Sequence, residues 1–100
     1  MRRGTTPTIT IQTDIDLTEY AVWVTFEQGT VQKDFIPTKS ADGKELEVTL
    51  TQEDTLAFSK GDVKIQIRAV DEGGTAIASN IMTAKVNELL KEGVITYASN

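Results

Sequence analysis

Hydrophobic and polar residues alternate most regularly in residues 62–70, where β-branched side chains also predominate. Successive side chains of a strand point to opposite faces of its sheet, so one face of this stretch is apolar and the other is polar. The apolar face carries Val63, Ile65, Ile67 and Ala69, and the polar face carries Lys64, Gln66 and Arg68. An antiparallel sheet with one face on a core has this pattern, and the stretch therefore predicts a β-domain.

Further strand patterns lie before this stretch. Residues 8–13 and residues 45–50 each predict a strand with one apolar face. Residues 19–27 predict a second strong strand, whose core face carries four large residues: Tyr20, Val22, Val24 and Phe26. This assignment leaves Trp23, the single tryptophan of the chain, on the outward face of the sheet.

Two other stretches alternate less regularly. Residues 30–37 predict the return strand of a hairpin with an ambiguous phase, and Pro37 indicates that this strand ends or lies at an edge. Residues 75–86 predict the last strand, but apolar residues fall on both of its faces. Such a strand either has a central position in its sheet or contains a bulge, and the sequence leaves both open.

Turn signals and one short helical signal separate these strands. Residues 41–44 contain Asp-Gly, which favours a tight turn with positive φ, and residues 71–74 form another glycine-rich loop. Thr51 is a suitable cap for a helical turn near residues 52–57, because the acidic residues that follow it lie near the positive end of the helix dipole.

Together these elements predict an all-β fold, an immunoglobulin-like antiparallel β-sandwich of about six or seven strands with a short helical turn near residues 52–57. A small antiparallel barrel is the alternative. Both architectures host many functions, so the fold by itself does not select one of them.

The chain divides into one domain and two short ends. Residues 1–7 predict a flexible N-terminal arm, because Gly4 is conformationally permissive and Pro7 lacks a backbone donor. Residues 8–93 predict the single β-sandwich domain, and residues 94–100 predict a C-terminal tail. A chain of 100 residues with 39% hydrophobic content has enough apolar side chains for one core.

Composition removes several kinds of chemistry. The sequence contains neither cysteine nor histidine, which excludes thiolate catalysis and disulfides and removes the commonest general base and zinc ligand. Serine and threonine nucleophiles therefore have no histidine partner, and no Gly-x-Ser-x-Gly motif occurs. We expect a protein that is not an enzyme and that has no cofactor.

Charge and hydropathy limit the partners in the same way. The net charge of −5 repels phosphate backbones, so we expect no nucleic-acid partner. The N-terminus lacks the apolar run of a secretory signal, and no stretch approaches the roughly 18 apolar residues of a membrane span. We expect no membrane association and a location in the cytoplasm, unless the protein leaves the cell inside an assembly.

Acidic residues in the stretch 14–19 are candidate ligands for a cation. Asp14, Asp16 and Glu19 are of the type that binds a hard cation, but the stretch lacks the glycine and the terminal glutamate of an EF-hand loop. A solvated turn accounts for these residues, and we therefore expect no metal.

Trp23 and the arginines of the arm are the candidate interface residues. Tryptophan is over-represented at binding hot spots, so an outward Trp23 would anchor another subunit. The commoner situation is a tryptophan covered by a loop or by the second sheet, and both readings stay open. Arg2 and Arg3 would reach an acidic neighbour from the arm, although arms of this kind are more often disordered.

Three segments carry a resemblance to a known family: Arg-Arg-Gly-Thr-Thr-Pro-Thr-Ile at residues 2–9, Leu-Thr-Gln-Glu-Asp-Thr-Leu-Ala-Phe at residues 50–58 and Ala-Ser-Asn-Ile-Met-Thr-Ala-Lys-Val at residues 78–86. They resemble small tail-associated proteins encoded by prophages of Gram-positive bacteria. More loosely, they are similar to the N-terminal immunoglobulin-like domain of phage upper-baseplate proteins. The likeness covers about residues 1–95.

This resemblance implies a structural protein of a phage tail or baseplate that acts by protein–protein docking. Its partners would be other phage structural proteins or further copies of itself. It would lie in the host cytoplasm during assembly and afterwards in the virion. The alternative is a surface binding module that recognises carbohydrate or peptide, and such a module would ordinarily need a secretion signal or a larger parent chain.

Overall fold

The computed structural model describes residues 1–79 and 82–86, without the side chains of Met82, Thr83 and Lys85. Eight strands and one helix occur in this part of the chain. In order they are β1 (Thr8–Gln12), β2 (Ala21–Gln28), β3 (Val31–Phe35), β4 (Thr38–Lys39), β5 (Glu45–Thr49), α1 (Gln52–Leu56), β6 (Gly61–Val70), β7 (Ala76–Ala78) and β8 (Met82–Val86).

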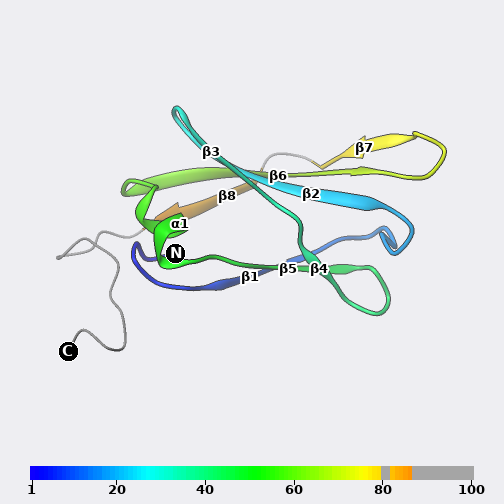
Figure 1. Cartoon of the computed structure of the whole chain (residues 1–100), viewed down its shortest axis with the longest axis horizontal. Helices are drawn as coiled ribbons and strands as arrows, with labels where there is room; N and C mark the ends of the chain where they lie inside the picture. Colours follow the sequence, from blue (N-terminus) through cyan, green and yellow to red (C-terminus); the bar gives the residue numbers. More distant parts are fainter. Residues whose placement is uncertain (80–81, 87–100) are drawn as a thin grey trace.

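The strands form two antiparallel sheets that lie in two layers (Figure 1). The small sheet has the order β1-β5-β4, and the large sheet has the order β3-β2-β6, with β7 and β8 sharing the far edge of β6. The helix α1 lies at one end of the sandwich, where the chain passes from β5 to β6. The predicted all-β sandwich with a short helical turn is therefore confirmed.

The strand order follows that of an immunoglobulin-like sandwich. Such a domain has strands A-B-E-D in one sheet and G-F-C in the other, with C′ added in variable-type domains. Here β1, β5 and β4 correspond to B, E and D, while β2, β3 and β6 correspond to C, C′ and F, and β7 with β8 corresponds to G. Among the described residues no strand occupies the place of A, which is the outer edge of β1.

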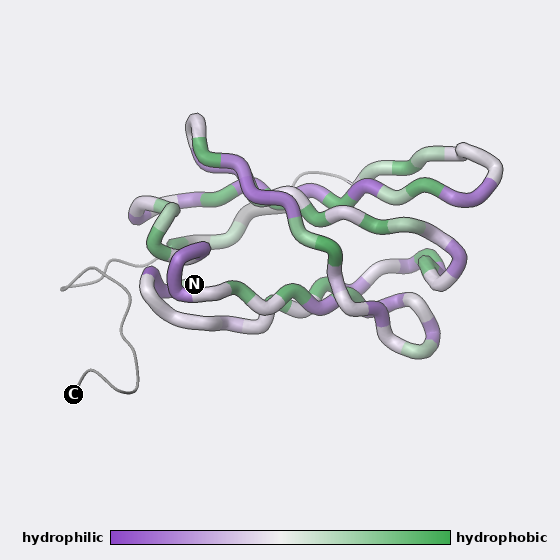
Figure 2. Tube along the Cα trace, in the orientation of Figure 1, coloured by the Kyte–Doolittle hydropathy of each residue, from purple (hydrophilic) through white to green (hydrophobic). Residues whose placement is uncertain are grey.

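The core lies between the two sheets and contains most of the residues that the alternation predicts. Tyr20 is an exception, because it precedes β2 and is only partly buried against the core. From β2, Val22, Val24 and Phe26 are buried, and β6 buries its four predicted apolar residues. The Phe26 ring meets the Phe35 ring edge-on at 5.3 Å between centroids, and it lies 6.4 Å from the ring of Phe58. Figure 2 shows hydrophobic and hydrophilic residues alternating along the strands of both layers.

The structure corrects the prediction of a single last strand in residues 75–86. Residues 75–86 form two strands, and both pair with β6. Two residues of β6 lie between Ile65 and Arg68, whereas three residues lie between their partners Met82 and Ala78. The extra residue shifts the phase by one position, which is why apolar residues occur on both faces of the sequence pattern. Of the two possibilities that the sequence left open, the register selects the bulge.

Ser79 replaces part of the interrupted ladder. Its backbone N–H donates to the carbonyl of Ile67 at 2.9 Å, and its Oγ accepts a hydrogen bond from the Ile67 N–H at 2.9 Å. The Gln66 side-chain amide donates to the Ser79 carbonyl at 3.1 Å. Because a buried backbone donor needs a partner, this serine makes the bulge compatible with a buried sheet.

The N-terminal arm lies against α1. Arg3 donates from Nε to the Phe58 carbonyl at 2.5 Å and from its guanidinium to the Leu56 carbonyl at 2.9 Å. The Thr55 hydroxyl donates to the Thr5 carbonyl at 2.9 Å. These bonds fasten the arm to the helix in the structure, while its flexibility in solution stays a prediction. The predicted end of the domain at residue 93 and the predicted tail 94–100 lie outside the described residues.

Candidate functional site

The outer face of the large sheet contains the candidate site. Its two central strands are paired so that Trp23 of β2 lies opposite Arg68 of β6, and Ala21 lies opposite Val70. The short strand β7 adds Ala78 beside Arg68 and another alanine beside Val70. Because all these side chains have the same phase in the pleat, they point away from the core and form one surface.

Trp23 is 54% exposed, so its predicted outward orientation is confirmed. Within the described residues neither a loop nor the second sheet covers it. Ile36, which is 81% exposed, follows the β2 partner Phe35 directly in the chain. Phe35 pairs with Val24, which follows Trp23 in β2. The next residue, Ile36, is therefore near the level of Trp23 where the chain leaves the sheet.

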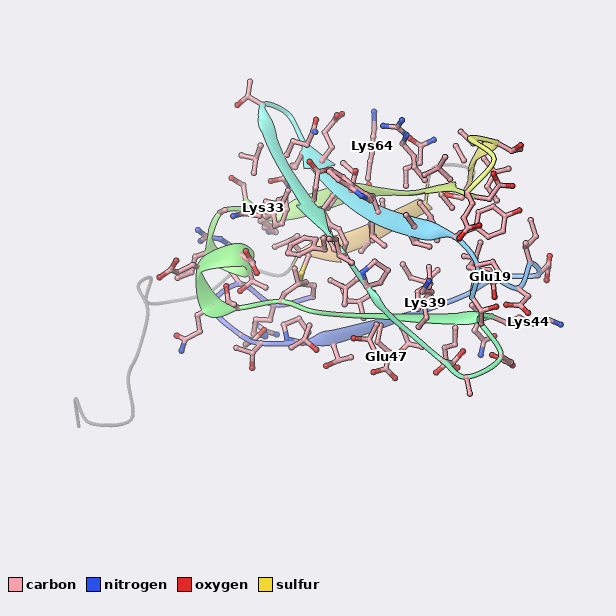
Figure 3. All side chains as sticks on the ribbon, turned by 45° about the vertical axis from the view of Figure 1, so that its right-hand side comes forward. Glu19, Lys33, Lys39, Lys44, Glu47 and Lys64 are labelled. Atoms are coloured by element: carbon pink, nitrogen blue, oxygen red, sulfur yellow. The ribbon has the colours of Figure 1, made fainter. Side chains whose placement is uncertain are left out.

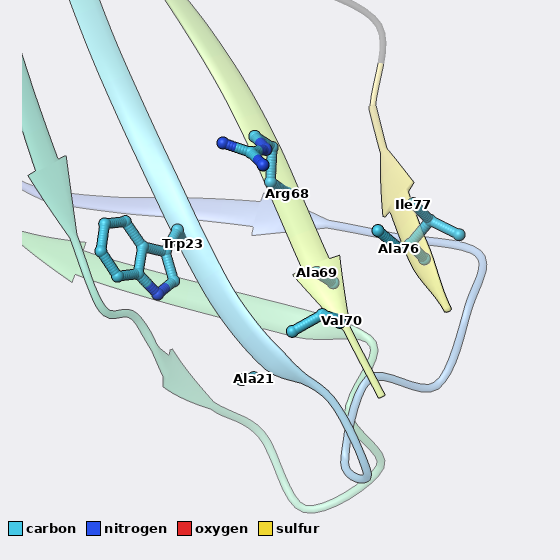
Figure 4. A pocket seen from close by; sticks show the side chains of 7 residues that line it. All are labelled: Ala21, Trp23, Arg68, Ala69, Val70, Ala76 and Ile77. Carbon is cyan, nitrogen blue, oxygen red and sulfur yellow. The ribbon is translucent and has the colours of Figure 1, made fainter. Parts of the chain in front are cut away.

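A hollow of about 270 Å³ lies in this surface. Figure 4 shows the side chains that line it, with Trp23 and Arg68 on neighbouring strands and β7 along the far side. Its lining is mainly apolar: Ala21, Trp23, Arg68, Ala69, Val70, Ala76 and Ile77. We call this hollow together with Ile36 the Trp23 surface.

Arg68 is the cation of the Trp23 surface. Its guanidinium has no hydrogen bond or ion pair with other residues of the described chain. On the same outer face Lys64 points away from the sandwich, as Figure 3 shows, and nearby polar groups such as Thr25 and Asp34 bond to each other at 2.6 Å. A protein with a net charge of −5 therefore presents free positive charge beside an exposed tryptophan.

Arg2 and Arg3, the other predicted interface residues, lie away from the Trp23 surface. Arg3 bonds to the carbonyls of Leu56 at the end of α1 and Phe58 shortly before β6, whereas Arg68 lies near the end of β6. Seven residues of strand separate Gly61 from Arg68, which is about 23 Å. The structure therefore does not bring the predicted arginines and Trp23 into one site, and the arginine beside Trp23 is Arg68.

The sequence pattern predicts Arg68 on a polar face that is either solvated or a docking surface, but it does not identify Arg68 as the neighbour of Trp23. The alternation in residues 62–70 was a sufficient signal for its outward direction. Its position beside Trp23 depends on the β2–β6 register, which pairs residues 45 positions apart in the chain.

In the acidic turn 14–19, the Asp16 carboxylate accepts a hydrogen bond within the loop. The Thr18 backbone N–H donates to Asp16 Oδ1 at 2.9 Å, and this bond holds the pKa of the Asp16 carboxyl below its ordinary value. In residues 1–79 and 82–86 no three acidic, histidine or cysteine side chains gather as metal ligands would.

Lys39 makes polar contacts that the sequence pattern did not indicate. Its Nζ donates to the carbonyls of Tyr20 at 2.7 Å and Leu17 at 3.2 Å, and it contacts the Thr18 carbonyl at 3.4 Å. Figure 3 shows this side chain between the two layers. The lysine therefore connects β4 of the small sheet to the turn that leads into β2 of the large sheet.

Comparison with known proteins gave no relative for this chain. No protein-family model, no curated protein and no solved structure matches it. No helix in the described part of the chain has the length and apolar composition needed to cross a bilayer.

Proposed function

We propose that this protein is a non-enzymatic structural component of a phage or prophage particle, in the tail or baseplate, and that it acts by protein–protein docking through the Trp23 surface. The observation that carries the docking role is the exposed Trp23 beside Arg68, which forms no ion pair or hydrogen bond with its side chain among the described residues. Tryptophan and arginine are the residue types most enriched among binding hot spots, particularly where a pocket surrounds them.

The chemistry of the Trp23 surface describes its partner. An apolar side chain of the partner fills the hollow beside Trp23, and a carboxylate pairs with Arg68. Removal of both charged groups from bulk water strengthens their Coulomb attraction and costs their desolvation, so the pair contributes mainly to the choice of partner. The outer part of the same face, around Lys64, is polar and forms a solvated rim.

The assignment to a phage particle rests on the resemblance of residues 2–9, 50–58 and 78–86 to prophage tail-associated proteins. In this proposal the partner is another phage structural protein or a second copy of the chain. The protein is made in the host cytoplasm and leaves the cell within the virion.

The test is the composition of particles from a strain that carries this gene in a prophage. Particles released after induction are purified on a density gradient, analysed by mass spectrometry and labelled with an antibody against this chain. We expect the chain in stoichiometric amounts, with gold label at the tail or baseplate. Intact tailed particles that lack the chain would contradict the assignment.

A complementation experiment tests the surface. A deletion strain is supplied with wild type, Trp23→Ala or Arg68→Ala, and incorporation into particles is measured. We expect incorporation to fall by about tenfold or more in both variants, as for hot-spot residues. Lys64→Ala, on the same strand and face but outside the hollow, is the matched control. Equal incorporation of all the variants would place docking elsewhere.

A surface module for carbohydrate or peptide is the second candidate, and the hollow beside the exposed Trp23 ring favours it. An aromatic face with adjacent polar groups is a common feature of small-ligand sites. Screening of the purified protein on glycan and peptide arrays distinguishes the two candidates. Two results together would favour this candidate: the wild type binds a glycan or peptide and Trp23→Ala does not, and purified particles lack the chain.

A further inference from the structure

One edge of strand β1 pairs with no other strand of the described residues. The Leu50 N–H donates to the Pro7 carbonyl at 2.9 Å, and the Thr13 N–H donates to the Lys44 carbonyl at 2.8 Å. Hydrogen-bonded positions alternate along an antiparallel pair, so the odd-numbered residues of β1 face β5. The backbone groups of the even-numbered residues Thr8, Thr10 and Gln12 therefore point away from the sheet.

These outward backbone groups have no hydrogen-bond partner in the described chain. Their edge is the one at which strand A pairs with strand B in a complete immunoglobulin-like sandwich. Strand A is antiparallel to B, so an added strand that completes this sheet would also be antiparallel to β1.

The edge also lacks the features that keep sheets from pairing with one another. Natural edge strands are short, charged, bulged or covered. Of the other edges in the described chain, β3 carries Lys33 and Asp34, β8 contains Lys85 and follows a bulge, and β4 and β7 have only two and three residues. Strand β1 has five residues, Thr-Ile-Thr-Ile-Gln, and none of them is charged.

We propose that the occupant of this edge is β1 of a second copy of the chain, paired antiparallel about a two-fold axis at Thr10. This register pairs Thr10 with its own copy and Thr8 with Gln12 of the other copy. In each of the three residue pairs, the backbone N–H and C=O groups of both residues point toward the other copy. Each pair therefore exchanges two backbone hydrogen bonds. The two small sheets then form one continuous sheet across the axis.

The side chains are compatible with this register. On the outer face threonine meets threonine, and Thr8 meets glutamine, both of which are uncharged pairs. On the inner face the half-buried Ile9 meets Ile11 of the other copy, which covers more of its apolar surface. Strand β1 is thus compatible with an antiparallel copy of itself, and a two-fold interface requires this self-complementarity.

Net charge does not oppose the dimer. The nearest acidic side chain on the outer face is Glu47 of β5, opposite Thr10. Three strand spacings separate Glu47 from its copy across the axis, which is about 14 Å. This distance exceeds the Debye length of about 8 Å at physiological ionic strength, so the repulsion is largely screened.

This dimer is independent of the proposed docking function, because β1 belongs to the small sheet and the Trp23 surface belongs to the large one. A variant of Thr10 therefore tests the edge without changing the Trp23 surface. Thr10 is exposed and its own N–H faces outward, so a substitution there leaves the β1–β5 ladder in place.

The experiment measures particle mass by sedimentation equilibrium over a range of concentrations. We expect a dimer for wild type and a monomer for Thr10→Lys and for Thr10→Glu, with a dissociation constant raised at least tenfold, because like charges would lie directly opposite across the axis. An equimolar mixture of the two variants pairs opposite charges, and we expect it to form a heterodimer.

Thr38→Lys is the matched control, because it adds the same charge to an exposed threonine of the small sheet at the opposite edge. We expect it to dimerise like wild type, and far-ultraviolet circular dichroism checks that each variant is folded. A monomeric wild type at millimolar concentration would overturn the proposal. So would a dimer that Thr10→Lys leaves intact and Trp23→Ala abolishes.

Discussion

Gly43 is the residue at which the absence of a side chain matters most. Its φ of +70° lies in the left-handed region, and a Cβ there would lie 2.7 Å from the Thr18 nitrogen, 2.8 Å from the Leu17 nitrogen and still closer to Asp16 Oδ1. Turn geometry and close packing of the backbone both require glycine at this position.

Gly43→Ala should therefore destabilise the fold by about 3 kcal/mol or more, because left-handed strain and a backbone clash add together. Gly29→Ala is the control, since Gly29 has φ +57° but open space around it. It should cost only about 1–2 kcal/mol. Urea unfolding measures both free energies, and similar losses in the two variants would contradict the close approach at Gly43.

Lys39 is the second residue with a defined structural effect. Removal of its ammonium group takes a charged donor from the carbonyls of Tyr20 and Leu17, although the Leu17 carbonyl keeps the Tyr20 N–H at 3.1 Å. Lys39→Met should therefore lower the free energy of unfolding by about 1.5–3 kcal/mol. Lys60→Met, which changes the charge equally at an exposed position without a hydrogen bond, should change it by less than about 0.5 kcal/mol. A loss of similar size in both would mean that net charge, not the carbonyl contacts, determines the effect.

At the scale of elements, α1 is a five-residue helix that depends on its cap. The Asp54 N–H donates to Thr51 Oγ1 at 3.1 Å, and the Thr51 N–H donates to Asp54 Oδ2 at 2.9 Å, which is a reciprocal capping box. Lys33 of β3 forms an ion pair with Asp54 at 3.4 Å. The helix is therefore connected to the large sheet as well as to its own first turn.

The capping carboxylate also makes stability depend on pH. Partial burial raises the pKa of Asp54, but the hydrogen bonds with Thr51 and the charge of Lys33 together lower it by a larger amount. The pKa therefore lies below the ordinary value of 3.8. A carboxyl with a lower pKa in the folded than in the unfolded state stabilises the fold above about pH 4. This stabilisation is lost as the pH falls through the folded pKa.

Asp54→Asn should lower the free energy of unfolding by about 1 kcal/mol at pH 7 and should lose less stability than wild type between pH 5 and pH 2. Glu53→Gln is the control, because it changes the charge of the same turn without contacting Thr51 or Lys33. Urea unfolding at several pH values gives both curves. An acid-induced loss in Asp54→Asn as large as that of wild type would contradict this account.

For the whole molecule, the two faces of β2 have different roles. Phe26 is fully buried in the core, and Trp23 is about half exposed on the same strand. Phe26→Ala should cost about 3–5 kcal/mol, whereas Trp23→Ala should cost less than about 1 kcal/mol.

Thermal and urea unfolding of the two variants test this contrast. A small stability effect of Trp23→Ala, together with reduced incorporation into particles, is the result expected of a docking residue. A loss comparable to that of Phe26→Ala would instead mean that Trp23 is part of the core and would remove the basis of the Trp23 surface.

Much of the fold follows from local patterns in the sequence. The period of two in residues 62–70 and 19–27 assigned each side chain to a face, since neighbouring residues of a strand point in opposite directions. Thr51 marked the start of α1, because a side-chain oxygen is needed where the first helical N–H groups have no backbone partner. The alternation alone therefore determined the outward direction of Trp23 and Arg68.

The tertiary structure decided the features that depend on strand pairing. It placed Arg68 beside Trp23, Arg3 at α1 and the bulge after β7, because each of these depends on register between residues far apart in the chain. Within the described residues it also left one edge of β1 unpaired, which cannot be recognised until the order of the strands is known. The sequence alone determined which side chains face outward, and only the fold decided which of them share a surface.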